Sequence, residues 1–216
     1  MVRKRKFGFC FLWILFVLAS VSDGFAAEVP VHVKWVVDGD TLILQDGRHV
    51  RYIGVDAPEI DHQHTQNTPL ANTARTVNQT LVDAYPLELV LDQQQKDHYG
   101  RTLAYVYRSD GVFVNLEMIR SGNAWCLFIP PNTLHAQLLL DAQHQAMTKG
   151  EGIWRSFGQD EKSPGAYVGN RRSKRFHHSS CPDGKKISKT NKVLFQCQWD
   201  AFWEGFAPHK ECAAFP

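Results

Sequence analysis

Acidic and arginine residues gather in three short motifs of this sequence. The first is Asp38-Gly39-Asp40-Thr41, in which two carboxylates flank a glycine at the junction of two β-rich segments. At such a junction at least one carboxylate can point into a cleft and take part in metal or acid–base chemistry. Asp-Gly is also ordinary turn chemistry, so a tight turn is the structural alternative.

The second motif runs from Arg51 to Glu59 and includes Asp56-Ala57-Pro58. Alternation along a strand places the odd-numbered positions 51–55 on one face and the even-numbered positions 52–56 on the other. Because Pro58 cannot donate to a strand ladder, Asp56 and Glu59 belong to the loop that leaves the strand. The alternative is an edge strand with a solvated arginine and a polar loop, which does not account for acid and arginine recurring so closely.

The third motif is Asp97-His98-Tyr99-Gly100-Arg101, a polar turn that delivers Arg101 to the start of an apolar strand. Here the structural alternative is an arginine that caps a hairpin. The three motifs together offer two arginines, two or three carboxylates able to bind a metal, and one further acid.

That inventory suits the hydrolysis of a phosphodiester. The guanidinium group of arginine binds two phosphate oxygens at once, in a bidentate pair of hydrogen bonds. It also stabilises the negative charge that develops around the phosphorus. A hard cation such as Ca²⁺ polarises the phosphate, and a glutamate can act on water as a general base. The sequence contains no cysteine–histidine metal box and no G-x-S-x-G nucleophile motif that would compete with this interpretation.

Hydrophobic patterning indicates the elements that hold these motifs. Strands are predicted over residues 31–37, 41–44, 49–55, 87–91 and 102–108, with a short extended segment at 112–114. Helices are predicted over 70–84, over 116–121 with Asn115 as N-cap, and from the residue after Thr133 to a C-terminal signal at Lys149-Gly150. The result is an α+β fold, mainly β: a small antiparallel barrel with three helices packed on it.

The three motifs, in this order and at this spacing, resemble the staphylococcal nuclease (thermonuclease) family. Pro131-Asn132 before a helix and the closing Gly152-Ile153-Trp154 also fit, and the resemblance covers roughly residues 30–155. It implies a five-stranded OB-type barrel with three helices. It also implies Ca²⁺-dependent cleavage of DNA and RNA that leaves 3′-phosphate ends.

The resemblance further implies a metal site and a general base. Asp40 and Asp56 would bind Ca²⁺ through their carboxylates, and Ala57 would bind it through its backbone carbonyl. Glu59 would act as general base or position the attacking water. The founding member of the family has a threonine where this chain has Ala57, a change that a backbone carbonyl ligand tolerates.

Four further residues correspond to the family's phosphate contacts. Arg51 and Arg101 would clamp the scissile phosphate. His98 and Tyr99 lie where the family contacts the phosphates of the nucleotide. His98 replaces a lysine of the family, so its phosphate contact should be weaker and should depend on pH near neutrality.

Two segments depart from the family pattern. The base-stacking tyrosines of the family have no counterpart before Pro131, where Trp125 or Phe128 could stack a base instead. After Glu59 the loop carries His62 and His64, which form either a transition-metal site or part of a solvated loop.

Residues 1–26 have the three-part layout of a secretory signal peptide: a basic start, an apolar run from Phe7 to Val21, and small residues at a cleavage site. The apolar run is shorter than the roughly 20 residues that span a bilayer, although an uncleaved membrane anchor is the alternative. The protein is therefore predicted to be secreted or periplasmic, without stable membrane insertion once the signal is removed.

Charge divides the rest of the chain. The predicted nuclease-like domain, residues 27–161, holds 10 basic and 17 acidic residues, whereas residues 162–216 hold 10 basic and 4 acidic ones. The latter segment is predicted to be a basic linker over 162–175 and a cysteine- and aromatic-rich appendage over 176–216. Basic segments attract polyanions, so the appendage is expected to collect nucleic acid. A solvated linker with a stabilising flap and a module that binds the cell envelope are the alternatives.

The cysteines outside the predicted signal are Cys126, Cys181, Cys197 and Cys212. In an oxidising compartment they suggest two disulfides, with three pairings open. A zinc site formed by His177, His178 and the tail cysteines is the alternative, although no C-x-x-C knuckle supports it.

The sequence thus predicts an exported, Ca²⁺-dependent, sugar-nonspecific endonuclease that acts on DNA and RNA as a monomer. The composition, with 44% hydrophobic and 21% charged residues, excludes collagen-like, coiled-coil and wholly disordered chains. The alternative function is a non-catalytic OB-fold module that binds nucleic acid or a partner. Glu59 and both arginines argue against this alternative, because a binding module has no need of the acid.

Overall fold

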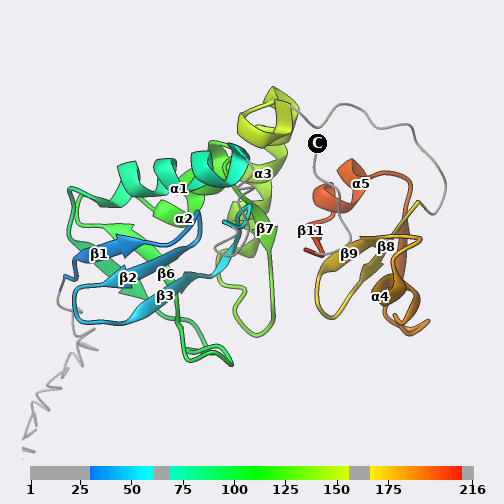
Figure 1. Ribbon diagram of the computed structural model, residues 1–216, viewed down its shortest axis with the longest axis horizontal. Coiled ribbons are helices and arrows are strands. Elements are labelled where there is room, and N and C mark those ends of the chain that lie inside the picture. Colours follow the sequence, from blue (N-terminus) through cyan, green and yellow to red (C-terminus); the bar gives the residue numbers. More distant parts are fainter. Residues whose placement is uncertain (1–29, 61–68, 156–165, 211–216) are drawn as a thin grey trace, which may run out of the picture.

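The computed structural model describes residues 30–60, 69–155 and 166–210 (Figure 1). A five-stranded sheet forms one side of the body, residues 30–155. Its strands in spatial order are β1 (Val33–Val36), β2 (Thr41–Leu44), β3 (His49–Tyr52), β6 (Thr102–Arg108) and β5 (Leu87–Val90). Neighbouring strands are antiparallel except for β3 and β6, which run parallel. The predicted signal peptide and the His62/His64 pair lie outside the described residues.

The two edges of this sheet approach each other without forming a closed ladder. A single bridge joins them, in which Val31 and Leu87 exchange two backbone hydrogen bonds of 2.8 and 2.7 Å. The α+β fold, rich in strands, is confirmed. The described residues do not form a continuous closed barrel.

The predicted strand over residues 49–55 is in fact two strands. After β3 the chain turns, and β4 (Gly54–Asp56) leaves the sheet to pair with β7 (Trp125–Leu127), a strand that the sequence did not predict. Gly54 has φ of 78°, and a Cβ there would lie 2.6 Å from Leu139 Cδ1. The positive φ and this close approach favour glycine at the turn. Because the chain turns here and divides the predicted strand, the predicted alternation of faces through residue 56 is wrong.

Three helices cover the sheet, as predicted. They are α1 (Pro69–Val82), α2 (Val114–Arg120) and α3 (Ala136–Lys149), followed by a 3₁₀ turn, η1 (Gly152–Arg155). α3 ends at Gly150 with φ of 65°, which confirms the predicted C-terminal signal. The predicted strand at 112–114 is reduced to one bridge between Tyr107 and Phe113.

Asn115 is not the N-cap of α2; Phe113 occupies that position. Asn115 is instead buried within the helix. Its Nδ2 donates to the carbonyl of Ile53 (2.9 Å), and its Oδ1 accepts from the N–H of Val106 (2.9 Å). Asn115 therefore satisfies backbone groups of two neighbouring segments at the point where the sheet opens toward β4.

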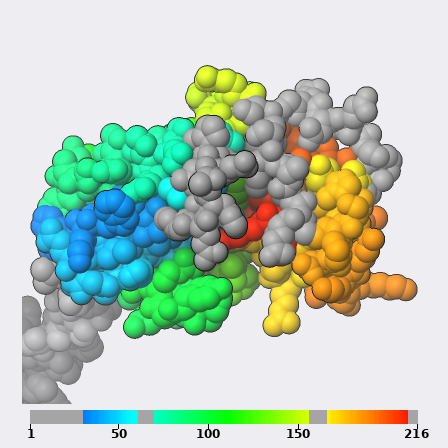
Figure 2. All heavy atoms as spheres, viewed as in Figure 1, coloured from blue at the N-terminus to red at the C-terminus, as the bar shows by residue number. Residues whose placement is uncertain are grey.

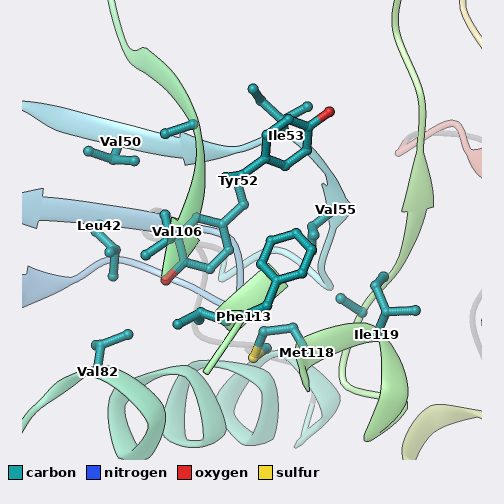
Figure 3. Close-up of a cluster of buried hydrophobic side chains, with 14 of the residues drawn as sticks. Leu42, Val50, Tyr52, Ile53, Val55, Val82, Val106, Phe113, Met118 and Ile119 are labelled. Carbon is teal, nitrogen blue, oxygen red and sulfur yellow. The ribbon is translucent and has the colours of Figure 1, made fainter. Parts of the chain in front are cut away.

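The main core lies between the sheet and the helices. Figure 3 shows side chains of β2, β3, β4 and β6 meeting Val82 of α1 and Met118 and Ile119 of α2. One buried polar group links this core to the first motif. Asn78 of α1 accepts a hydrogen bond from the Tyr52 hydroxyl and donates to the carbonyl of Asp38, both at 2.8 Å.

Residues 166–210 form a separate small unit, here called the C-terminal module. Its sheet has the spatial order β10 (Lys192–Phe195), β8 (Tyr167–Asn170), β9 (Arg175–His178) and β11 (Ala207–Pro208), with helices α4 (Pro182–Lys185) and α5 (Gln198–Trp203). β8 and the first residue of β9 lie within the range that the sequence assigned to a basic linker.

The C-terminal module packs against β7 and α3 of the body (Figures 1 and 2). Their shared hydrophobic cluster includes Met147 and Trp154 from the body and Phe176, Phe202 and Phe206 from the module. A polar contact accompanies this cluster, because Gln143 of α3 hydrogen-bonds to the backbone of Cys126 in the body and to that of Phe202 in the module. Apolar burial on this scale fixes the position of the module relative to the body.

Cys126 is a buried free thiol whose pKa is raised by burial. The prediction of two disulfides among the four cysteines is therefore wrong. A disulfide between tail cysteines stays a prediction, because Cys212 lies outside the described residues. Within the described ranges, no helix combines the length and the apolar character needed to cross a membrane.

Candidate active site

A pocket of about 450 Å³ opens where the body meets the C-terminal module. Six of the eight site residues predicted from the sequence line it: Arg51, Asp56, Glu59, His98, Tyr99 and Arg101. The other two predicted residues adjoin it, since Asp40 contacts Arg51 and Ala57 lines a smaller hollow together with Asp56 and Glu59. The three sequence motifs therefore meet in space.

Arg51 joins the first two motifs. Its guanidinium pairs with Asp40 through Nη1 and with Asp56 through Nη2, the latter at 2.9 Å. Arg51 and Asp56 were predicted to lie on opposite faces of one strand. The turn at Gly54 carries β4 away from β3 and so lets Asp56 return to the arginine.

Asp40 is buried, with 2% of its surface exposed. Its Oδ1 accepts a hydrogen bond from the Thr41 hydroxyl (2.9 Å), and its Oδ2 accepts from the N–H of Ala57 (2.7 Å). Burial raises the pKa of Asp40 to about 7, and the nearby Arg51 only partly opposes this rise. These contacts hold the backbone of Ala57 beside the Asp40 carboxylate.

Asp56 is also buried but is held in its ionised form. Its Oδ2 accepts from the indole N–H of Trp125 (2.8 Å), the residue opposite Asp56 in the β4–β7 ladder. Arg175 of the C-terminal module donates to both carboxylate oxygens, at 2.5 and 3.0 Å. Burial favours the neutral acid, but Arg175 and then Arg51 outweigh it and lower the pKa of Asp56 below its ordinary value.

Glu59 lies at the exposed mouth of the pocket. Its side chain is 45% exposed, and its Oε1 pairs with the ammonium group of Lys210, which follows β11. An acid that is open to solvent on one side can reach a water molecule, as a general base requires.

The third motif forms another part of the pocket wall. Asp97 accepts the backbone N–H of Arg101 (3.0 Å) and its Nε (2.7 Å), which fixes the direction of the guanidinium. The Arg101 guanidinium carbon lies 5.5 Å from the centroid of the Tyr99 ring, and the rings of His98 and Tyr99 are 3.7 Å apart. Tyr99 is 74% exposed, so this part of the wall presents an aromatic surface beside a cation.

Comparison with known proteins places this geometry in a family. Residues 49–156 match the family model described as staphylococcal nuclease homologue. This chain belongs to the staphylococcal nuclease family. The nuclease is 39% identical over 125 residues to thermonuclease of Staphylococcus intermedius. The matched region covers 56% of this chain and 74% of that protein.

Two further relatives agree with this assignment. Thermonuclease of Staphylococcus hyicus is 36% identical over 132 residues, 60% of this nuclease and 78% of the relative. Endonuclease YncB of Bacillus subtilis is 34% identical over 149 residues, 66% of each chain. The family and these relatives identify the chain as a nuclease, an enzyme whose substrates are nucleic acids.

Three residues of the nuclease site were not predicted from the sequence in the places where they occur. Trp125 was one of two residues, with Phe128, that could stack a base, but it is 3% exposed and its indole N–H is bound to Asp56, so it does not serve as a stacking surface. Arg175 and Lys210 entered the sequence analysis only in the count of ten basic residues over 162–216. Their charge was visible in the sequence, but their positions opposite Asp56 and Glu59 were not.

The oxygen donors of the nuclease fit a hard divalent cation. Asp40, Asp56 and the backbone of Ala57 lie together, and carboxylate and carbonyl oxygens are the ligands that Ca²⁺ prefers. The oxygens of Asp56 accept hydrogen bonds from Trp125 and both arginines, so a cation at Asp56 has to displace one of these donors. Within the described ranges, no three His, Cys, Asp or Glu side chains form a ready cluster for a metal.

Proposed function

We propose that this nuclease is an exported, Ca²⁺-dependent endonuclease that hydrolyses DNA and RNA to 3′-phosphate products. The observation that supports it is the meeting of Arg51, Asp56, Glu59 and Arg101 at one pocket. These residues supply two phosphate-binding cations, a carboxylate able to bind metal, and an exposed acid. The family assignment as an enzyme disfavours the alternative of a non-catalytic binding module.

Asp40, Asp56 and the carbonyl of Ala57 would hold the Ca²⁺. When bound there, the cation supplies a Lewis acid that polarises a phosphate oxygen. Arg51 already bridges the two carboxylates, so its guanidinium is fixed next to the place where the phosphate would bind. The pre-set direction of a charged donor stabilises developing negative charge at little reorganisation cost.

Glu59 takes the proton from the attacking water. Its place at the exposed mouth of the pocket gives that water access from solvent. Arg101, whose guanidinium is held in direction by Asp97, also binds the phosphate. His98 and Tyr99 contact the neighbouring nucleotide, through a phosphate or by stacking on a base.

The remaining parts of the proposal concern architecture and location. We propose that the five-stranded sheet is of the OB type, and the single bridge between Val31 and Leu87 that joins its two edges supports this assignment. Residues 1–26 direct export to the periplasm or the medium, and the mature enzyme acts as a monomer. The C-terminal module adds positive charge beside the acidic body. Part of this charge lies in the hairpin formed by β8 and β9, which carries Arg171, Arg172, Lys174 and Arg175.

The test is digestion of single-stranded DNA, duplex DNA and RNA with Ca²⁺, with chelator, and with the Glu59→Gln variant. Loss of a general base lowers the rate by about 10²-fold or more. Glu88→Gln, which changes an exposed acid on β5, serves as the matched control and should keep full activity. Mass spectrometry of the products should find 3′-phosphate ends. Cleavage that persists in chelator, or full activity of Glu59→Gln, would contradict the proposal.

A further inference from the structure

The C-terminal module places an arginine directly on a predicted metal ligand. Arg175 donates hydrogen bonds to both carboxylate oxygens of Asp56, although the two residues are 119 positions apart in the sequence. The Arg175 side chain is 20% exposed and that of Asp56 is 4% exposed, so this ion pair is largely shielded from water. Bidentate arginine–carboxylate pairs in such surroundings are among the strong charged contacts of proteins.

The fold of the module holds Arg175 in this position. Arg175 is the first residue of β9 and pairs with Ala207 in the parallel β9–β11 ladder. Its Nη1 also donates to the carbonyl of Pro208 at 2.9 Å. The guanidinium is thus supported by the backbone of β11 while it contacts Asp56.

A second cation of the module lies beside the predicted base. Lys210 follows β11 and pairs with Glu59. Both of these side chains are substantially exposed, so this contact is weak by itself. Its position matters more than its strength, because Arg175 and Lys210 together bring two positive charges to Asp56 and Glu59. That is the charge of one divalent cation.

We propose that Arg175 competes with the divalent cation for Asp56, so that the C-terminal module restrains metal binding in the active site. This inference rests on the proposed role of Asp56 as a metal ligand. The Asp56 oxygens are already occupied by donors from Arg51, Arg175 and Trp125. Arg51 and Trp125 belong to the body, whereas Arg175 reaches Asp56 from the C-terminal module. The side chain of Arg175 is also the most exposed of these three donors, so a cation displaces it most readily.

The expected effect follows from population arithmetic. In the closed state Arg175 contacts Asp56, and in the open state it does not. If Ca²⁺ binds only the open state, its apparent affinity falls in proportion to the fraction of molecules in that state. A shielded charged pair holds the closed state in excess by about 10-fold or more. Removal of Arg175 should therefore tighten Ca²⁺ binding by about 10-fold or more. Loss of a positive charge elsewhere in the same module should leave Ca²⁺ binding unchanged.

The experiment uses the full chain and measures Ca²⁺ binding by isothermal titration calorimetry for wild type, Arg175→Gln and Arg175→Lys. Arg172→Gln is the matched control, because Arg172 lies in the same hairpin, is exposed, and loses the same charge. The indole N–H resonance of Trp125 gives a second readout, since this group donates to Asp56. Asp56→Asn should abolish the calorimetric signal in every background.

The expected result is a Kd for Ca²⁺ about 10-fold or more lower in Arg175→Gln, a smaller decrease in Arg175→Lys, and no change in Arg172→Gln. The Trp125 resonance should shift when Arg175 is removed and again when Ca²⁺ is added. An unchanged or weaker affinity in both Arg175 variants overturns the competition. If wild type cleaves DNA with Ca²⁺ in that case, the proposed function stands; if no variant binds Ca²⁺ and cleavage ignores chelator, both fail.

Discussion

One buried glutamine joins the body to the C-terminal module beside their shared hydrophobic cluster, and its replacement tests this contact. Gln143 of α3 is fully buried. Its Oε1 accepts from the N–H of Cys126 in β7, and its Nε2 donates to the carbonyl of Phe202 in α5, both at 2.6 Å. The side chain thus connects the backbone of the body to the backbone of the module.

The variant Gln143→Leu keeps the approximate size of the side chain and removes both hydrogen bonds. The Cys126 N–H is left without a partner, at a cost of about 1–3 kcal/mol. The Phe202 carbonyl still accepts the N–H of Gly205 at 2.9 Å, so the loss of its second donor costs about 0.5–1.5 kcal/mol. The added apolar surface of leucine returns about 1 kcal/mol. We therefore expect the free energy of unfolding to fall by about 0.5–3.5 kcal/mol.

Urea unfolding followed by circular dichroism measures this change, with the midpoint as the readout and the slope as a check on two-state behaviour. Gln137→Leu is the matched control, because Gln137 is exposed on the same helix and bonds only locally to Asp141. Its stability should stay within about 0.5 kcal/mol of wild type. If Gln143→Leu were as stable as wild type, the reasoning that these two hydrogen bonds stabilise the contact between body and module would be refuted.

Three other perturbations follow from the structure. Gly54→Ala should lower the free energy of unfolding by about 2–4 kcal/mol in the same urea assay, because φ is positive and the new methyl group meets Leu139; a neutral effect would contradict the turn. Burial opposes ionisation of Asp92, but backbone N–H donors, including that of Leu134, lower its pKa. Its contribution to stability is therefore present above its ordinary pKa and lost as pH falls through the lowered value. Asp92→Asn should destabilise the protein by about 1 kcal/mol at neutral pH and by less in acid, as urea midpoints across pH would show. Tyr99→Ala should raise KM for single-stranded DNA about fivefold or more with little change in kcat, since the ring is exposed at the rim of the pocket; an unchanged KM would exclude stacking there.

The local features of the fold could be predicted because their signals are local. Period-2 and period-3.6 patterns lie within single segments, so the strands of the five-stranded sheet and the three helices of the body were expected close to where they occur. Gly150 ended α3 as predicted, since a C-cap depends only on neighbouring residues. The N-cap predicted at Asn115 failed, because a buried side chain served two distant backbone groups instead.

The break at Gly54 shows where local patterning stops being sufficient. Alternation from residue 49 to 55 favoured one strand, and only the packing of Leu139 against the turn explains why it divides. That division moves Asp56 onto the same arginine as Asp40. β7 escaped prediction for a related reason, since a three-residue strand has too short a pattern to stand out.

The sequence by itself determined the chemistry of this protein: the order and spacing of three motifs indicate the nuclease family, and six of their eight predicted residues line one pocket. Only the tertiary structure decided what surrounds them. Arg175 reaches Asp56 across 119 positions and Lys210 reaches Glu59 across 151. Composition showed that the tail is basic, but no local pattern encodes which acid a distant cation will meet. That pairing is set by the burial of the aromatic cluster between body and module, a non-local hydrophobic contact that exists only once both have folded.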